Sequence, residues 1–238
     1  MESRHGAVTK RAKQFVADSW QSQANLSFFL GLQVLIAFVL PVLGFGRSDL
    51  RLYSDLGFSI LLVSGVAIAW GQWRLFTFAG VISLAALAVR WIAWFRDLKP
   101  WELASDGFTV AASVAIALVL LRQIFRDGPV TSVRIQGAIA VYLLFGVGWA
   151  HAYHIVNVLR PGSFALPANP AASFGDWIYF SYSTLTTVGY GDITPVGPVA
   201  RTLAMGEALT GQLYLAVLIA RLVAMEIIYW QERHMRQQ

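Results

Sequence analysis

The sequence lacks cysteine and is poor in charged residues. Without thiol groups, none of its 238 residues can form a disulfide or a thiolate metal site. Charged residues make up 13% of the chain, whereas a soluble globular domain has about 25%. Hydrophobic residues reach 57%, and the mean hydropathy is +0.58. This composition excludes an ordinary soluble domain and predicts an integral membrane protein.

The sequence also lacks the residue patterns that are typical of enzymes. It has no Ser/His/Asp grouping, no glycine-rich phosphate loop and no carboxylate pair suited to acid–base catalysis. We therefore expect no enzyme activity and no cofactor. The net charge of +5 comes from basic residues that lie mainly between apolar blocks, where they bear on membrane topology. Nucleic acid is not an expected partner.

Six apolar stretches are long enough, or nearly so, to cross a bilayer as helices, which takes about 20 residues. With the amino terminus inside, both termini are cytosolic and most Lys and Arg residues lie on the inner side, as the positive-inside rule requires. The expected fold class is an all-α membrane protein with six transmembrane helices, located in the cell (plasma) membrane in contact with lipids. The stretches cover residues 26–45, 56–72, 75–95, 107–121, 135–158 and 198–222.

Between the last two stretches lies a polar segment that contains "STLTTVGYGD", residues 183–192. Gly189 and Gly191 are two positions apart, and glycine adopts left-handed backbone conformations without steric cost. A backbone that alternates in hand turns successive carbonyl oxygens toward one axis, where they can replace the water around a dehydrated cation. The segment is therefore predicted to be an ion-selectivity filter. The oxygens expected to face the ion are the carbonyls of Thr187, Val188, Gly189 and Tyr190 and the Thr187 hydroxyl.

The sequence "TVGYGD", which ends at Asp192, resembles the signature of potassium channels. The resemblance extends over residues 135–222 and implies K⁺ as the permeant ion, bound by the oxygens named above. It also implies a re-entrant pore helix before the filter and a homotetramer, because one filter per chain cannot surround an ion. Two alternatives are a non-selective cation channel and a non-conducting membrane receptor or assembly subunit in which the filter-like loop is structural.

The segment "DWIYFSYSTLT" has no Gly or Pro and begins at Asp176, which is a natural N-cap. It predicts a pore helix whose negative dipole end faces the ion path. We expect its aromatic residues to form a cuff around Tyr190, or alternatively an interfacial belt. Ser183 stands where a well-known branch of the family has a glutamate that pairs with the filter aspartate, so that carboxyl pair is missing. The aromatic residues are Trp177, Tyr179, Phe180 and Tyr182.

The last apolar stretch is expected to line the pore. By the spacing of Gly211 from Arg201, the resemblance implies a gating hinge at Gly211, with close helix packing as the alternative. One face of this helix is assigned to the cavity and gate, where Gln212 would offer a polar group and Leu215 or Ile219 a dewetting constriction. This face comprises Ala208, Gln212, Leu215 and Ile219.

Three polar residues inside the apolar stretches are candidates for regulation. A charged Glu207 exposed to lipid would be costly, so we expect it to face protein near the filter or to be protonated. Its expected role is a hydrogen bond to the pore helix, with a pH-sensitive role as the alternative. Whether it replaces the missing carboxyl pair is a hypothesis.

The other two candidates, His151 and His154, share one helical face and could bind a metal or sense protons. Because no carboxylate or third histidine lies beside them in the sequence, we expect structural histidines.

The sequence gives no sign of a voltage sensor. Such a sensor needs a cation at every third position of a membrane helix, and residues 107–121 have none, so we expect no steep voltage sensing. Arg90, Arg96 and Lys99 are expected to snorkel toward the membrane surface.

These assignments divide the chain into four parts. They are a basic amphipathic cytosolic arm (1–24), a four-helix transmembrane domain (25–128), a pore domain (129–224) and a short cytosolic tail (225–238).

Overall fold

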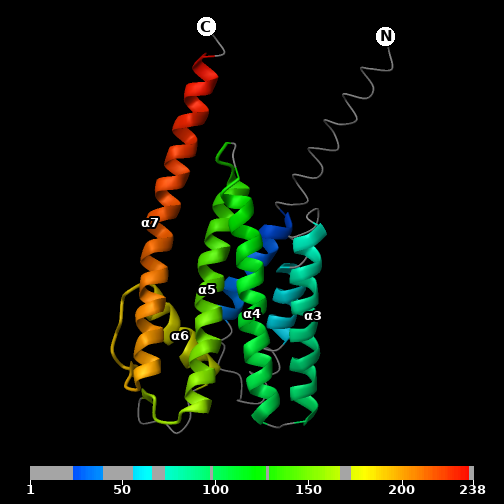
Figure 1. Ribbon diagram of the computed structural model, residues 1–238, viewed down its shortest axis with the longest axis vertical. Coiled ribbons are helices and arrows are strands. Elements are labelled where there is room, and N and C mark those ends of the chain that lie inside the picture. The colour runs from blue at the N-terminus through cyan, green and yellow to red at the C-terminus, as the bar shows by residue number, and fades with distance from the viewer. Residues whose placement is uncertain are drawn as a thin grey trace.

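The computed structural model describes residues 24–39, 56–65, 73–96, 99–126, 129–166 and 173–235. These residues are almost entirely helical (Figure 1). The expected all-α class holds apart from one pair of two-residue strands. In chain order the elements are an apolar helix at Ala24–Val39 that ends in the π-helical turn η1 (Leu35–Val39), a helix at Leu56–Gly65, α3 (Trp73–Arg96), α4 (Lys99–Ile124), α5 (Ser132–Leu159), β1 (Phe164–Ala165), α6 (Phe174–Leu185), β2 (Thr194–Pro195) and α7 (Pro198–Met235).

Among the described residues, three helices are long and apolar enough to cross a membrane: Pro100–Ile124, Ser132–Leu159 and Pro198–Met235. They correspond to the fourth, fifth and sixth predicted stretches. The third predicted stretch lies inside α3. The described parts of the first two stretches form the shorter helices Ala24–Val39 and Leu56–Gly65, and the rest of both stretches lies outside the described residues. Nearly all of the predicted amino-terminal arm also lies outside the described residues.

The prediction for the fourth helix was wrong at both ends, because α4 begins at Lys99 and continues to Ile124. Residues 99–106, which precede the predicted stretch, include the acidic Glu102 and Asp106. The structure accommodates this polar turn inside the protein, where Asp106 is only 7% exposed. A buried partner from a distant helix thus allows a carboxylate within an otherwise apolar helix.

The helix α7 continues past residue 222 to Met235, so it extends into the segment assigned to the tail. At 1.5 Å per residue its 38 residues span about 57 Å, nearly twice the roughly 30 Å hydrocarbon layer of a bilayer. In Figure 1 the end of α7 extends beyond the ends of α3, α4 and α5.

The helix α5 is the centre of the packing. It contacts α4 on one side and α6 and α7 on the other, while α3 packs against α4. Its fully buried residues Val141, Leu144, Val147 and Ala150 recur at every third position, which is the spacing of one helical face. Gln33 from the first helix donates to the Ala140 carbonyl at 3.1 Å, so the core joins the amino-terminal helices to α5.

The expectation of snorkelling was wrong for Arg90. This side chain is buried, and its guanidinium carbon lies 4.9 Å from the centre of the Phe58 ring. Such a position over an aromatic face compensates a cation for part of its lost hydration. The side chains of Arg96 and Lys99 lie outside the described residues.

The two short strands bring together the segments on either side of the predicted filter. Phe164 pairs with Pro195 and Ala165 with Thr194 in an antiparallel ladder. The amides of Val196 and Gly197 extend this contact by donating to the Ser163 carbonyl at 2.9 and 3.0 Å. The chain leaving the filter is therefore held beside the chain that precedes α6.

The predicted pore helix is present as α6, but its N-cap is Ser173 rather than Asp176. Asp176 occupies the third helical position, where its carboxylate accepts hydrogen bonds from the Ser173 backbone N–H at 2.6 Å and from the Ser173 hydroxyl at 2.9 Å. This is a capping box, in which an acidic residue satisfies the amide of the cap that precedes it. The acidic side chain therefore fixes the start of α6 from inside its first turn.

Candidate functional site

The backbone between α6 and β2 alternates in hand. Positive φ angles occur at Thr187 (61°), Gly189 (56°) and Gly191 (81°), and no other non-glycine residue of the described chain shares this sign with Thr187. The left-handed conformation expected at both glycines is confirmed. Thr187 was missed, because a β-branched residue at positive φ is a rare exception that sequence preferences exclude. Such strain costs on the order of 1–3 kcal/mol and persists only where the surroundings enforce it.

The last turn of α6 supplies that enforcement. The Thr187 amide donates to the Thr184 carbonyl at 2.9 Å, and the Gly189 amide donates to the Ser183 carbonyl at 3.1 Å. The Ser183 hydroxyl accepts a further, longer bond from the Tyr190 amide at 3.4 Å. Two polar atoms of Ser183 therefore fix the backbone at Gly189 and Tyr190 of the candidate filter. This is the position at which the sequence lacks the carboxylate of the well-known branch.

Gly211 on α7 lies directly against the end of α6. A Cβ atom at this position would lie 2.1 Å from the Leu185 carbonyl oxygen, which is a backbone atom and cannot rotate away. The same carbonyl accepts a hydrogen bond from the Tyr142 hydroxyl at 3.3 Å. The helix is continuous through Gly211, so this contact favours close packing as the reason for the glycine. The hinge stays a prediction.

The face of α7 assigned to the pore is separate from its packed face. Gln212 donates from Nε2 to the Thr187 hydroxyl at 3.4 Å, which joins α7 to the start of the candidate filter. Ala208 is half-buried, and Leu215 and Ile219 are exposed. Sequence spacing alone did not reveal the contact between Gln212 and Thr187, because 25 residues separate the two positions.

Within one chain the expected aromatic cuff is limited to Tyr179. Its ring stacks on that of Tyr190 with centroids 6.1 Å apart and planes 8° apart. Trp177 and Phe180 are buried against Phe164 from β1 instead, at 5.0 and 5.7 Å between centroids. The Tyr182 hydroxyl donates to the Leu143 carbonyl on α5 at 2.7 Å. Three of the four aromatic residues therefore anchor α6 in the protein rather than contacting Tyr190.

The predicted hydrogen bond between Glu207 and the pore helix is confirmed. Glu207 is fully buried, and its Oε1 lies 2.5 Å from the Ser181 hydroxyl oxygen of α6. The Tyr153 hydroxyl of α5 donates to Oε2. The Asp192 carboxylate has a different partner, since it accepts from the Ile193 amide at 3.0 Å.

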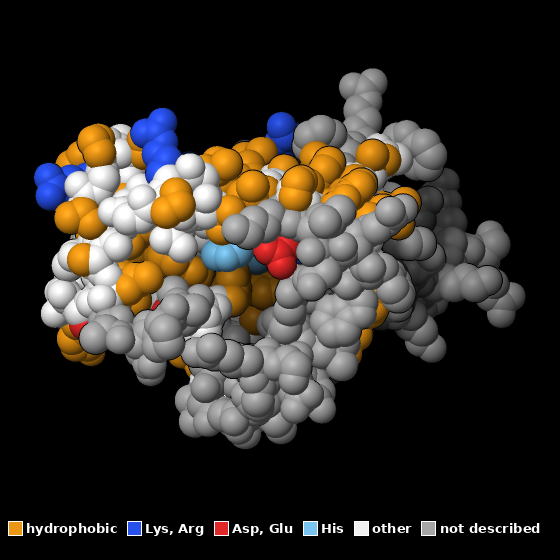
Figure 2. Space-filling view, turned by 90° about the horizontal axis from the view of Figure 1, so that it is seen from below, with side chains coloured by type: hydrophobic (Ala, Val, Ile, Leu, Met, Phe, Trp, Pro, Cys, Tyr) orange, Lys and Arg blue, Asp and Glu red, His pale blue; other side chains and the backbone are white. Residues whose placement is uncertain are grey.

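A carboxylate lies beside the two histidines in space, although none lies beside them in the sequence. Asp106 from α4 lies between them, with 2.8 Å from Oδ1 to His151 Nδ1 and 2.7 Å from Oδ2 to His154 Nδ1. In the part of the chain that the structure describes, no group of three or more His, Cys, Asp or Glu side chains is placed so that it could hold a metal ion. Figure 2 shows a histidine and an acidic side chain together in a hollow of the end face. These three residues connect α4 to α5.

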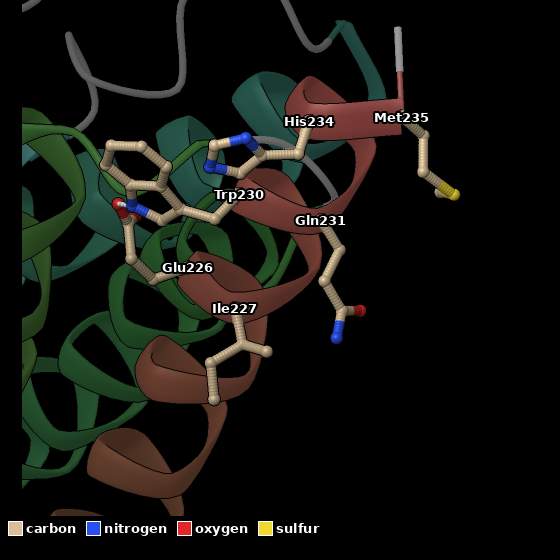
Figure 3. Close-up of a pocket in the computed structure, with 6 residues that line it drawn as sticks. All are labelled: Glu226, Ile227, Trp230, Gln231, His234 and Met235. Carbon is tan, nitrogen blue, oxygen red and sulfur yellow. Dashed lines mark hydrogen bonds between the residues drawn. The ribbon is translucent and has the colours of Figure 1, made fainter. Parts of the chain in front are cut away.

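A separate shallow groove lies on the carboxyl-terminal part of α7 and is drawn in Figure 3. There the Trp230 indole donates to Glu226 at 3.0 Å and stacks on the His234 ring at 5.9 Å between centroids. All residues that line the groove come from α7 alone, and they follow the predicted gate along the helix. The groove is therefore distinct from the candidate filter.

The family model described as "Ion channel" matches residues 137–227. The match begins in α5 and includes α6, the alternating stretch and most of α7. It therefore covers the elements that build the candidate site. No solved structure matches the chain significantly.

Relatives of known name match shorter parts of the chain. The inward rectifier potassium channel Kirbac3.1 of Paramagnetospirillum magnetotacticum is 39% identical over 74 residues, which are 31% of this chain and 22% of the relative. Protein LctB of Bacillus caldotenax is 39% identical over 87 residues, 34% of this chain and 64% of the relative. The two pore potassium channel c of Oryza sativa subsp. japonica is 38% identical over 64 residues, 27% of this chain and 14% of the relative.

The chain thus spans less than two thirds of each of these relatives. A channel family, with potassium channels among the relatives, confirms the expectation that the chain is not an enzyme. The polar stretch with its flanking helices is the part that carries this relationship. Residues 137–227 therefore match an ion channel family, and potassium channels are among the relatives that match parts of the chain.

Proposed function

We propose that the chain is one subunit of a homotetrameric, potassium-selective channel that conducts K⁺ passively across the cell membrane. The observation that carries this proposal is the alternation of backbone hand at Thr187, Gly189 and Gly191. Alternation at every second residue directs successive carbonyls to one side, which is what a dehydrated cation requires. The K⁺ ligands are the carbonyls of Thr187, Val188, Gly189 and Tyr190 and the Thr187 hydroxyl, and Gly191 and Asp192 complete the filter.

The exposed surface of a single chain supports the tetramer. Val188 is 53% exposed and Tyr190 73%, although both side chains must be packed to hold a filter at a fixed width. Leu209, Leu213 and Val217 of α7 are also exposed. Four copies around a common axis would cover part of these surfaces and complete a ring of carbonyls, with lipid covering the outward faces.

The contact of Gln212 with Thr187 supports a cavity directly below the filter. In this proposal Ala208 and Gln212 line the cavity, and Leu215 and Ile219 form a constriction that gates by dewetting. Gly211 acts as a hinge if the channel opens by bending α7. The continuous helix described above is then the unbent conformation of the chain.

The remaining parts of the proposal follow the predicted topology. Six spans place both termini in the cytosol, with a four-helix domain at residues 25–128 and a pore domain at residues 129–224. Residues 100–121 of α4 contain no Lys or Arg. Each charge that crosses the membrane field supplies about 2.3 kcal/mol per 100 mV, and this part of α4 has no basic residue to supply it, so we expect no steep voltage gating.

A flux assay with the purified protein in liposomes tests the proposal. Wild-type protein is expected to carry K⁺ down a gradient and to carry little Na⁺, and Gly189→Ala is expected to abolish the K⁺ flux, because φ is +56° there. Gly162→Ala is the matched control: its φ is +82°, nothing lies within 4 Å of the added Cβ, and it lies outside the filter. Equal Na⁺ flux would indicate a non-selective cation channel. Absence of flux together with absence of stabilisation by K⁺ would favour a structural loop.

A further inference from the structure

The carboxyl group of Glu207 is buried in the protein. Its hydrogen-bond partners are Tyr153 of α5 and Ser181 of α6. The titratable groups that face it are the hydroxyls of Tyr142, Tyr153 and Tyr182, and no Lys, Arg or His of the described residues interacts with it. A carboxylate in such a position would be an uncompensated charge in an apolar interior.

The number of protons between these groups determines the state of Glu207. The Ser181 hydroxyl oxygen lies 2.7 Å from the Gly146 carbonyl oxygen of α5 and 2.5 Å from Glu207 Oε1. A carbonyl can only accept, and a serine has one hydroxyl proton. If Ser181 donates that proton to Gly146, the proton in the contact with Glu207 must come from Glu207 itself. An ionised Glu207 would leave one of these two close oxygen pairs with no proton between them.

We infer that Glu207 is a neutral carboxylic acid whose proton connects α7 to the pore helix. The chain of donors begins at the Tyr153 hydroxyl, which donates to Oε2. Glu207 Oε1–H donates to Ser181, and Ser181 donates to the Gly146 carbonyl, so every close oxygen pair has one proton. A carboxylic acid kept neutral by an apolar site can act as a hydrogen-bond donor in this way.

The hydrogen bond between Glu207 and Ser181 is linked to the candidate filter through the last residues of α6. Ser181 lies two residues before Ser183, which accepts from the amides of Gly189 and Tyr190. Glu207 is therefore a positioning residue: its proton fixes α6, and α6 fixes the alternating backbone. Loss of the proton would break the contact with Ser181 and leave a buried charge beside three tyrosine hydroxyls. This functional consequence rests on the proposed channel activity, whereas the protonation state does not.

Infrared difference spectroscopy of the purified protein tests the protonation state without any flux measurement. Wild type minus Glu207→Gln at neutral pH is expected to show the carbonyl stretch of a protonated carboxylic acid, shifted in D₂O. Glu226→Gln, on the same helix but in contact with Trp230 near the end of α7, should leave that band in place. Carboxylate bands alone in the difference spectrum would overturn the inference, whether or not the protein conducts K⁺.

The pH dependence of thermal unfolding tests the connection between the helices. A glutamine amide can donate to Ser181 and accept from Tyr153, so Glu207→Gln should match the wild-type unfolding temperature near pH 4, where the unfolded chain also holds the Glu207 proton. As the pH rises further, the unfolded chain loses this proton while the folded chain keeps it, so the wild-type unfolding temperature should fall and then level off once the folded carboxyl group ionises. The unfolding temperature of Glu207→Gln should fall less. Ser181→Ala should reduce the difference between the two curves. Identical pH profiles for wild type and Glu207→Gln would refute the connection.

Discussion

The helices α5 and α7 are both apolar, yet they differ in how much of their surface is buried within one chain. Half of the most apolar window of α5 is buried in the chain, compared with 17% of that of α7. α5 lies between α4 on one side and α6 and α7 on the other, whereas α7 contacts α5, α6 and β2 among the described elements. The difference indicates that α5 is packed within the chain along most of its length, whereas much of the apolar surface of α7 is not.

The same contrast appears in the glycines of the two helices. A Cβ at Gly146 of α5 would lie 2.4 Å from the ring of Tyr182, a side chain of the pore helix. At Gly211 of α7 it would meet backbone, the Leu185 carbonyl. Each long helix therefore uses one glycine to approach α6 closely. The pore helix is fixed from both sides, even though one of the two helices is otherwise exposed.

The largest expected effect comes from truncating a matched pair of leucines. Leu144 of α5 is fully buried and Leu213 of α7 is 61% exposed. Leu144→Ala should lower the free energy of unfolding by about 2–5 kcal/mol, because it creates a cavity that the core cannot fill. Leu213→Ala should leave the fold of each subunit unchanged and should change, if anything, the fraction of tetramer. Thermal unfolding in detergent combined with native mass spectrometry separates the two quantities.

An equal loss of subunit stability in both variants would contradict this comparison, because it would mean that α7 is packed within the subunit. The Ala exchange is the same in the two positions, so differences in helix propensity do not contribute. Only the surroundings of the side chain differ.

A smaller effect is expected for Gly211→Ala. The added methyl group would have to move backbone at Leu185, and overpacking of this kind costs about 1–3 kcal/mol. K⁺ flux should fall with stability, because α6 would move away from α7. Gly206→Ala, one turn earlier, is the control, since its nearest neighbour would be the Trp149 ring at an ordinary 3.5 Å. Similar stability of both variants would remove close packing as the reason for Gly211 and leave the hinge as its role.

The alternating stretch was predictable because its determinants are local. Glycine is the residue type that favours positive φ, and both Gly189 and Gly191 adopt it. The helix before them ends at Leu185, close to the end of the predicted pore helix. Asp106 was not predictable as a partner of His151 and His154, because it lies on another helix and sequence spacing carries no information about that contact. The partners of Glu207 belong to two other helices, so only the confirmed contact with the pore helix was foreseen.

The smallest expected effect concerns the polar contact between Gln212, on the exposed face of α7, and the candidate filter. Gln212→Leu removes the 3.4 Å hydrogen bond to the Thr187 hydroxyl, which at this length contributes about 1 kcal/mol or less. If the hydroxyl is a K⁺ ligand, the concentration of K⁺ that stabilises the protein against heating should rise by up to about fivefold. Gln231→Leu, near the end of the same helix, should have no such effect. Equal K⁺ dependence in both variants would show that Gln212 does not influence the ion site, so that the exposed face of α7 would act on ions only through the width of the pore.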